Sequence, residues 1–192
     1  GNLGNILDFD NLTEEDIFVL DSPILTNSQL RKFKKIFSKK IRIIDCTFNV
    51  NESIKSNLGR IKSESETAVR EGGTTLILSD KNISNKRTYI PMVLAVGSVN
   101  SNLVKLGLRG YCSINVETSE TLDTHSFAVL IGVGATTVNP YLTIDSINQR
   151  FQKYLLFPYK IGGAVQTSLR RYAHVDQPQG RIGHKIGLRR HQ

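Results

Sequence analysis

The stretch that decides the fold runs from residue 66 to residue 140 and begins ETAVREGGTTLILSD (66–80). In these first residues a helix-like run ends at a pair of glycines, and the apolar run TTLIL follows at once. The same alternation recurs in IPMVLAVG (90–97) with YCSINVE (111–117), and in HSFAVLIG (125–132) with TTVNP (136–140). Helices alternating with short, continuous apolar strands are typical of a parallel sheet covered by helices on both faces. The stretch therefore predicts a βαβαβ arrangement.

Turn residues mark the ends of these predicted helices. Gly72 suits a left-handed C-terminal cap, and Pro91 suits a first helical turn, where its missing N–H costs nothing. The run TLDT (121–124) offers hydroxyl and carboxylate N-caps for the next helix. Gly132 and Gly134 are expected to close that helix.

The flanking residues extend the pattern. IRIIDCTF (41–48) is β-branched and predicts the first strand of the sheet, and residues 50–71 predict a crossover helix with a break near Gly59. Residues 27–37 predict a basic amphipathic helix packed by its apolar face, and 141–156 predict a last helix. Right-handed crossovers make every strand parallel. The expected fold class is α/β, with parallel β/α units forming an incomplete barrel-like or open sheet.

Charge and composition divide the chain into three parts. Residues 1–22 form a lead-in, where Thr13 could cap a short helix, 23–157 the α/β domain, and 158–192 a basic, Gly-rich, irregular tail. Of the net charge of +8, residues 1–150 contribute +1 (17 Lys/Arg against 16 Asp/Glu) and residues 151–192 contribute +7 (8 against 1). The tail has no aromatic stacking motif, so nucleic-acid binding is a weaker interpretation than a tail outside the fold. No apolar run reaches the length of a membrane span, so no membrane partner is expected.

The two cysteines, Cys46 and Cys112, lie in predicted strands 66 positions apart, which favours reduced core thiols in a reducing compartment. A metal site formed by these thiols with His125 lacks any close CxxC spacing. Asp123 and His125 could form an acid–base pair, but their spacing does not bring them face to face on a helix, so capping is expected. We expect no metal site and no catalytic residue.

Three predicted strands end in a polar residue: Asp80, Glu117 and Asn139. Ligands usually bind at the C-terminal edge of a parallel sheet, so these residues could line a sugar-phosphate or flavin site. No Gly-rich phosphate turn follows any of the three strands, and the GVG motif at 132–134 follows a helix instead of a strand. A scaffold layer that binds no ligand is the preferred interpretation, and a ligand site at these residues stays open.

From Leu20 onward the sequence resembles the central domain of the glutamate synthase large chain. The matching segments are LDSPILTN (20–27), IDCTF (44–48), AVREG (68–72), LILSD (76–80), IPMVLAV (90–96), GLR (107–109), and HSFAVLIGVGA (125–135) leading to VNPYL (138–142). They cover most of residues 4–148 in the expected order. Residues after about Tyr154 depart from the family pattern.

The resemblance implies a piece of an oxidoreductase that makes L-glutamate from L-glutamine and 2-oxoglutarate in nitrogen assimilation. In that family a cysteine nucleophile frees ammonia from glutamine. The ammonia is added to 2-oxoglutarate at an FMN, which receives its electrons through a [3Fe-4S] cluster. FAD is a further possible cofactor of the parent enzyme. All these groups lie outside this chain. The central domain is implied to bind no cofactor, to have no catalytic, cofactor-binding or metal-binding residue, and to connect the glutaminase and FMN domains.

The segments AVG (95–97) and THSF (124–127) resemble the ferredoxin-dependent glutamate synthases of plastids and cyanobacteria. The resemblance therefore implies ferredoxin as a partner and the chloroplast stroma as location. Alternatives are an NADPH-dependent synthase, a bacterial cytoplasm, and a stand-alone flavin- or phosphate-binding half barrel.

Overall fold

The computed structural model describes residues 20–156, with side chains described as far as residue 152. Four strands form one parallel sheet in the order β1-β3-β5-β6, as the sequence predicts. They are β1 (Ile41–Asp45), β3 (Thr75–Ser79), β5 (Ser113–Glu117) and β6 (Thr137–Asn139). The possible helix at Thr13 and the basic tail lie outside the described residues. The boundaries at 22 and 157 remain predictions.

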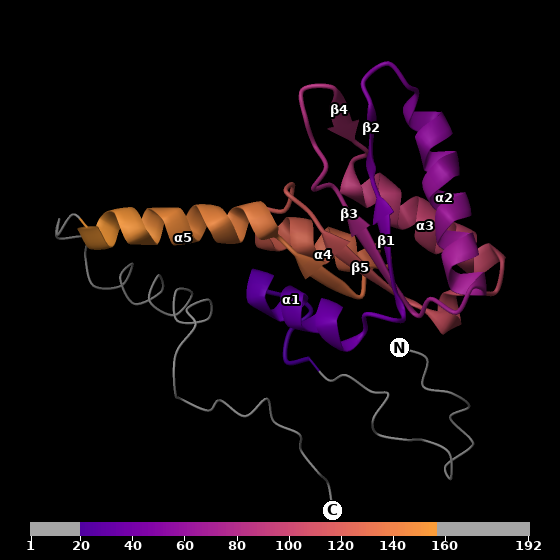
Figure 1. Cartoon of the computed structure of the whole chain (residues 1–192), viewed down its shortest axis with the longest axis horizontal. Coiled ribbons are helices and arrows are strands. Elements are labelled where there is room, and N and C mark those ends of the chain that lie inside the picture. The colour runs from indigo at the N-terminus through magenta and orange to yellow at the C-terminus, as the bar shows by residue number, and fades with distance from the viewer. Residues whose placement is uncertain (1–19, 157–192) are drawn as a thin grey trace, which may run out of the picture.

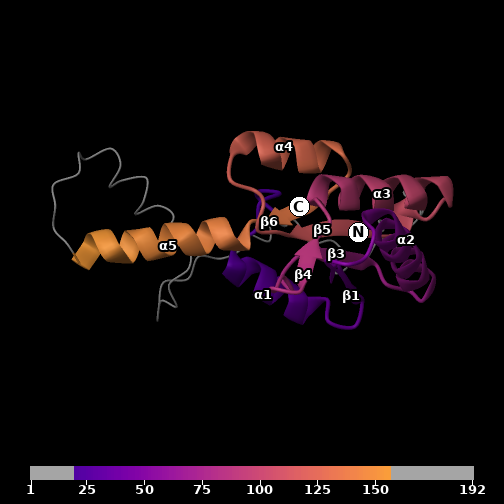
Figure 2. The ribbon, with the colours of Figure 1, turned by 90° about the horizontal axis from the view of Figure 1, so that it is seen from above.

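One face of the sheet, here called the outer face, carries the main core. Three crossover helices cover it, namely α2 (Ile54–Arg70), α3 (Met92–Lys105) and α4 (Thr124–Gly132). Figure 2 shows α3 and α4 on one side of the strands. Strand residues of this face, such as Leu78 and Val116, are neighbours in register and are buried against helix residues such as Val96. Because strands adjacent in sequence are adjacent in space, successive crossovers keep these helices on one face.

The other face, called the inner face, carries α1 (Asn27–Ile36), which lies across the sheet from α3 and α4 (Figure 2). The Thr26 side chain accepts from the N–H of Gln29, whose own side chain accepts from the N–H of Thr26, so a capping box starts the helix. Leu30 and Phe33 are buried against Ile77 of β3. The predicted amphipathic helix therefore packs by its apolar face, and helices cover both faces of the sheet.

The predicted first strand is wrong at its C-terminal end. β1 ends at Asp45 because its Oδ1 accepts from both the N–H (2.8 Å) and the hydroxyl (2.7 Å) of Thr47, which turns the chain. The residues beyond form β2 (Thr47–Asn49), which pairs antiparallel with β4 (Arg87–Tyr89) in a second, two-stranded sheet. No local pattern in the sequence predicts this small sheet.

The predicted break near Gly59 is also wrong, since α2 runs unbroken from Ile54. Burial of Ile61 and Val69 holds the helix together, and the Ser53 side chain caps it by accepting from the N–H of Ser56. Gly59 therefore sits in the helix interior as a tolerated weak point.

Most other predicted helix ends are confirmed. Gly72 has φ +86° directly after α2, and α3 begins directly after Pro91. Asp123 caps α4, and Gly134 just beyond that helix has φ +119°. A 3-10 turn (η2, Arg109–Tyr111) precedes β5. The last helix, α5 (Tyr141–Leu156), agrees with the predicted range and projects away from the sheet (Figure 1).

Candidate functional site

The C-terminal edge of the sheet gathers the polar strand-end residues. Asp45, Ser79, Glu117 and Asn139 are neighbours in register, and Asp80 follows Ser79 directly. The structure therefore brings the predicted trio of Asp80, Glu117 and Asn139 to one edge. Side chains alternate between the two faces along a strand, so Glu117 and Asn139 lie in one row on the inner face. Asp80 lies one residue further along the chain than Ser79, which is in that row.

Glu117 is the centre of an ion cluster on the inner face. Its carboxylate is 3% exposed and accepts from Lys34 Nζ of α1 (3.1 Å), from Lys81 Nζ (2.7 Å) and from the Ser79 hydroxyl (3.0 Å). Burial by itself raises the pKa of Glu117, but the hydrogen bonds and charges of Lys81 and Lys34 outweigh burial and hold the pKa below its usual 4.5. The cluster ties α1 to the sheet edge and keeps Glu117 ionised.

Asp80 is fully buried and organises the loop after β5. Its Oδ2 accepts from the Thr118 hydroxyl (2.8 Å) and from the N–H (2.8 Å) and hydroxyl (3.0 Å) of Ser119. Burial, followed by the charge of Asp80, raises the pKa of Tyr141 to about 12. Lys81 Nζ lies 5.0 Å from the centroid of the Tyr141 ring. Asp80 thus acts as a hydrogen-bond acceptor for the loop.

Asn139 fastens the residues before α1 to the sheet. Its Nδ2 donates to the carbonyl of Leu25 (2.8 Å) and to Asn27 Oδ1 (2.9 Å), and Ile24 forms a parallel bridge with Val138. The polar end of β6 therefore closes that edge of the sheet.

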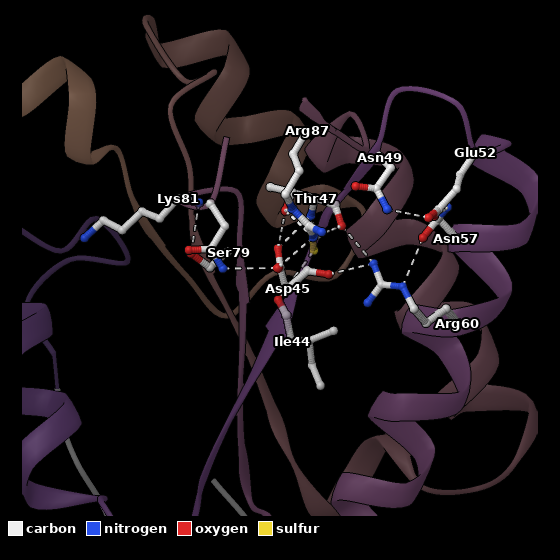
Figure 3. Close-up of polar contacts among 12 residues, drawn as sticks. Ile44, Asp45, Thr47, Asn49, Glu52, Asn57, Arg60, Ser79, Lys81 and Arg87 are labelled. Atoms are coloured by element: carbon white, nitrogen blue, oxygen red, sulfur yellow. Dashed lines mark hydrogen bonds and ion pairs between the residues drawn. The ribbon is translucent and has the colours of Figure 1, made fainter. Parts of the chain in front are cut away.

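A second ion cluster surrounds Asp45 at the opposite edge strand (Figure 3). Arg87 Nη2 lies 3.1 Å from Asp45 Oδ2 and 2.8 Å from the Thr47 hydroxyl. Burial raises the pKa of Asp45, but hydrogen bonds from Asn82 and Thr47, with the charge of Arg87, lower it below 3.8 overall. Arg60 of α2 donates to the carbonyls of Asp45 (2.9 Å) and Thr47 (3.1 Å), which joins the helix to the bend between β1 and β2.

Two of the helix N-termini at this edge, those of α3 and α4, are filled by the chain's own carboxylates. Glu120 Oε2 accepts from the N–H of Met92 at the start of α3 (2.6 Å), and Asp123 Oδ1 accepts from the N–H of Ser126 in α4 (2.8 Å). Helix N-termini are where a flavin phosphate would be expected in such a sheet. With carboxylates already there, a phosphate does not fit these positions.

Two hollows of about 420 and 460 Å³ lie away from the strand-end residues. The first runs along α3 between Lys62, Gly97 and Lys105, and the second lies by Gly73 and Tyr111 at the opposite end of the sheet. Neither is lined by a residue of the two ion clusters.

The cysteines are both buried free thiols, and burial raises the pKa of Cys46 to about 12. Within residues 20–156, no group of three or more His, Cys, Asp and Glu side chains is arranged to hold a metal ion. Asp123 caps α4 through the N–H and hydroxyl of Ser126 rather than forming the alternative acid–base pair with His125. The GVG motif is a helix stop, since α4 ends at Gly132 and Gly134 has φ +119°. The carbonyl of Gly134 accepts from Arg109 Nη2 (2.9 Å).

Sequence reasoning missed the cations of both clusters. Lys34 looked like part of a solvated helix face, and Lys81, Arg60 and Arg87 lie in segments where nothing in the sequence marked a partner. A positive residue directly after a strand-end acid, as Lys81 follows Asp80, is the one signal that could have indicated charge pairing at this edge.

Comparison with known proteins gives one consistent result. Residues 1–176 match the family model described as "Glutamate synthase central domain". The chain is 46% identical over 158 residues to the glutamate synthase [NADPH] large chain of Azospirillum brasilense, covering 81% of this chain and 10% of that protein. It is 34% identical over 155 residues to the chloroplastic ferredoxin-dependent glutamate synthase of Spinacia oleracea, covering 78% and 10%.

A third relative, the glutamate synthase [NADPH] large chain of Bacillus subtilis, is 34% identical over 134 residues, covering 70% of this chain and 9% of that protein. The chain spans about a tenth of the length of these relatives. Among the described helices, none is both long and apolar enough to cross a membrane. The chain belongs to the glutamate synthase central domain family.

Proposed function

We propose that this chain is the non-catalytic connector between the glutaminase and FMN domains of a glutamate synthase. The observation that carries the proposal is the state of the sheet edge, where α/β enzymes usually bind their ligands. Glu117 is engaged by two lysines, Asp45 by Arg87, and Asp80 by the loop after β5. Glu117 and Asp45 are neutralised by cations of the same chain, whereas the buried Asp80 is held by hydrogen bonds to its Oδ2. Such internal pairing stabilises a scaffold and leaves Glu117 and Asp45 little charge for a substrate.

In this proposal the parent enzyme makes L-glutamate from L-glutamine and 2-oxoglutarate. The cysteine nucleophile, the FMN and the [3Fe-4S] cluster belong to the neighbouring domains, which are the partners of this segment. Nucleic acid and membrane have no part in the proposal. The segment contributes rigidity, because the edge ion clusters fix α1 and α2 to the sheet and the hydrogen bonds of Asp80 fix the loop after β5.

The electron donor is the finer part of the proposal. The segments AVG (95–97) and THSF (124–127) favour a ferredoxin-dependent enzyme of the chloroplast stroma. The 46% identity to the NADPH enzyme of Azospirillum brasilense, against 34% to the spinach ferredoxin enzyme, favours the alternative of an NADPH-dependent synthase of a bacterial cytoplasm. Reducing the complete enzyme with NADPH or with reduced ferredoxin, and comparing the rates, distinguishes the two.

The connector role is tested on the purified chain. We expect no glutamine hydrolysis, no conversion of 2-oxoglutarate with added reductant and FMN, and no saturable quenching of FMN fluorescence. Turnover by the chain, or saturable FMN binding that is lost in Asp80→Ala, would instead support the flavin-binding half barrel.

A further inference from the structure

Helix α1 carries an unusual concentration of positive charge. Residues 27–42 hold seven Lys and Arg and no Asp or Glu. Lys34 is paired with Glu117, whereas Arg31, Lys32 and Lys35 are exposed and form no ion pair within residues 20–156. Because Leu30 and Phe33 point into the sheet, these three cations line the side of α1 that faces away from it.

Uncovered apolar surface adjoins this basic helix. Ile36 of α1 is 61% exposed, and Ile43 of β1 is 58% exposed. Ile43 is the register neighbour of Ile77, which is fully buried beneath α1. The cover that α1 gives to the inner face therefore reaches Ile41 at the start of β1 but leaves Ile43 open.

The backbone of β1 is open at the same place. Thr75 N–H donates to the Lys40 carbonyl and Cys46 N–H donates to the Ser79 carbonyl, so the even-numbered residues of β1 bond to β3. The N–H and carbonyl of Ile43 consequently point toward the free edge of the sheet. An open edge next to an exposed isoleucine is a surface that proteins usually cover.

Leu20 shows which part of the chain reaches this surface. It is the first described residue, and it packs against the inner-face cluster of Leu30, Phe33 and Ile77. Leu20 is the covalent link between residues 1–19 and the α1 face. They hold five acidic residues and no Lys or Arg: Asp8, Asp10, Glu14, Glu15 and Asp16. Apolar residues such as Ile6, Phe9, Ile17 and Phe18 are interspersed among them.

We propose that residues 5–19 dock on the surface formed by Arg31, Lys32, Lys35, Ile36 and Ile43. The acids of the segment pair with the three cations, and its apolar side chains cover the two isoleucines. Charge selects this occupant, because residues 157–192 carry seven Lys and Arg against one acid and would be repelled. A second copy would bring one basic helix against another.

Tethering makes weak contacts sufficient. A short linker gives an effective concentration in the millimolar range, so exposed ion pairs that are weak individually can add up to docking. Exposed charges are screened over about 10 Å at 0.1 M salt, so the contact must weaken as salt rises.

Amide hydrogen exchange of the complete 192-residue chain tests the proposal, with the Ile43 N–H as reporter. We expect its exchange to speed up several-fold between low and high salt. Glu14→Lys/Glu15→Lys/Asp16→Lys should speed it up likewise at low salt, and so should Arg31→Glu/Lys32→Glu/Lys35→Glu. The combination of both triple variants should restore slow exchange, because the pairs are re-formed with opposite sign.

The matched control is Lys55→Glu/Lys105→Glu, which changes exposed cations of α2 and α3 and should leave Ile43 unchanged. The proposal would be overturned if the exchange rate of the Ile43 N–H changed neither with salt nor in the triple variant of the acidic residues. The salt series uses the wild-type chain, so it does not depend on a variant that folds. Failure of the combined variant to restore slow exchange would also overturn it. Sedimentation showing a dimer that dissociates in parallel with Ile43 exposure would assign the surface to a second copy and reject the segment.

Discussion

Replacing Glu117 by glutamine removes one negative charge from the edge cluster and keeps its shape. The carboxylate holds Lys81 (2.7 Å), Lys34 (3.1 Å) and Ser79 (3.0 Å) and is itself 3% exposed. A hydrogen bond to a charged group contributes about 1.5–3 kcal/mol, whereas an exposed ion pair contributes about 0.2–1 kcal/mol. The side chains of Lys34 and Lys81 are 30% and 49% exposed and can be solvated by water when the carboxylate is lost. The contributions of these two ion pairs to stability must therefore be discounted. We expect Glu117→Gln to lower the free energy of unfolding by about 1.5–3 kcal/mol at neutral pH.

The pH dependence gives the sharper test of this cluster. The folded-state pKa of Glu117 lies below 4.5, so its stabilisation is fully present above the unfolded-state value and is lost as the pH falls through the folded value. The difference between wild type and Glu117→Gln should therefore shrink as the pH falls below 4.5. Urea denaturation followed by circular dichroism at pH 7 and at several values below 4.5 measures both free energies.

A surface ion pair provides the control. Glu66 forms a 2.9 Å pair with Arg70 one helical turn away, with both side chains partly exposed, so Glu66→Gln should cost no more than about 0.5 kcal/mol. The reasoning is refuted if Glu117→Gln costs as little as this control at pH 7. A difference from wild type that grows on acidification would refute it equally.

Three further predictions concern the backbone, the core thiol and the second cluster. Gly59→Ala should raise the free energy of unfolding by about 0.4–1 kcal/mol, because the new methyl group meets no neighbouring atom in the helix interior. Gly72→Ala should lower the free energy of unfolding by about 1 kcal/mol, because Gly72 has φ +86°. Calorimetry that gives both changes the same sign would contradict this pair. Cys46, whose burial raises its pKa to about 12, should react with a thiol reagent at pH 8 only after denaturation, and rapid labelling of the native chain would contradict its burial. Arg60→Ala should lower the free energy of unfolding by about 1–3 kcal/mol and speed hydrogen exchange in β2, because two carbonyls lose a charged donor; unchanged exchange there would show that α2 does not hold the bend.

The parallel sheet could be predicted because its strands are short and continuously apolar and its turns are marked by glycine and proline. Gly72 and Pro91 act through local backbone geometry, which the sequence shows directly. The β2–β4 sheet could not be predicted in this way. It depends on the contact between Asp45 and Thr47 and on pairing with residues about 40 positions later, which no local pattern contains.

At the sheet edge, the sequence located the acids but not their partners. Asp80 and Glu117 could be placed because a strand's last residue must lie at the edge. The pairing of Glu117 with Lys34 joins residues 83 positions apart, and it exists only because α1 crosses the inner face. Long-range charge pairs follow from tertiary packing, so the periodicity of the sequence does not predict them.

The connector role is tested most directly in the complete enzyme. The measurement uses the Azospirillum brasilense large chain in which its own central domain is replaced by this segment. The measured quantity is the ratio of glutamine hydrolysed to 2-oxoglutarate converted. We predict a ratio close to that of the unaltered enzyme, and a rise in uncoupled glutamine hydrolysis when Glu117→Gln and Arg60→Ala loosen the segment. Both half-reactions proceeding at an unchanged ratio after the segment is loosened would contradict a connector that holds the two catalytic domains in register.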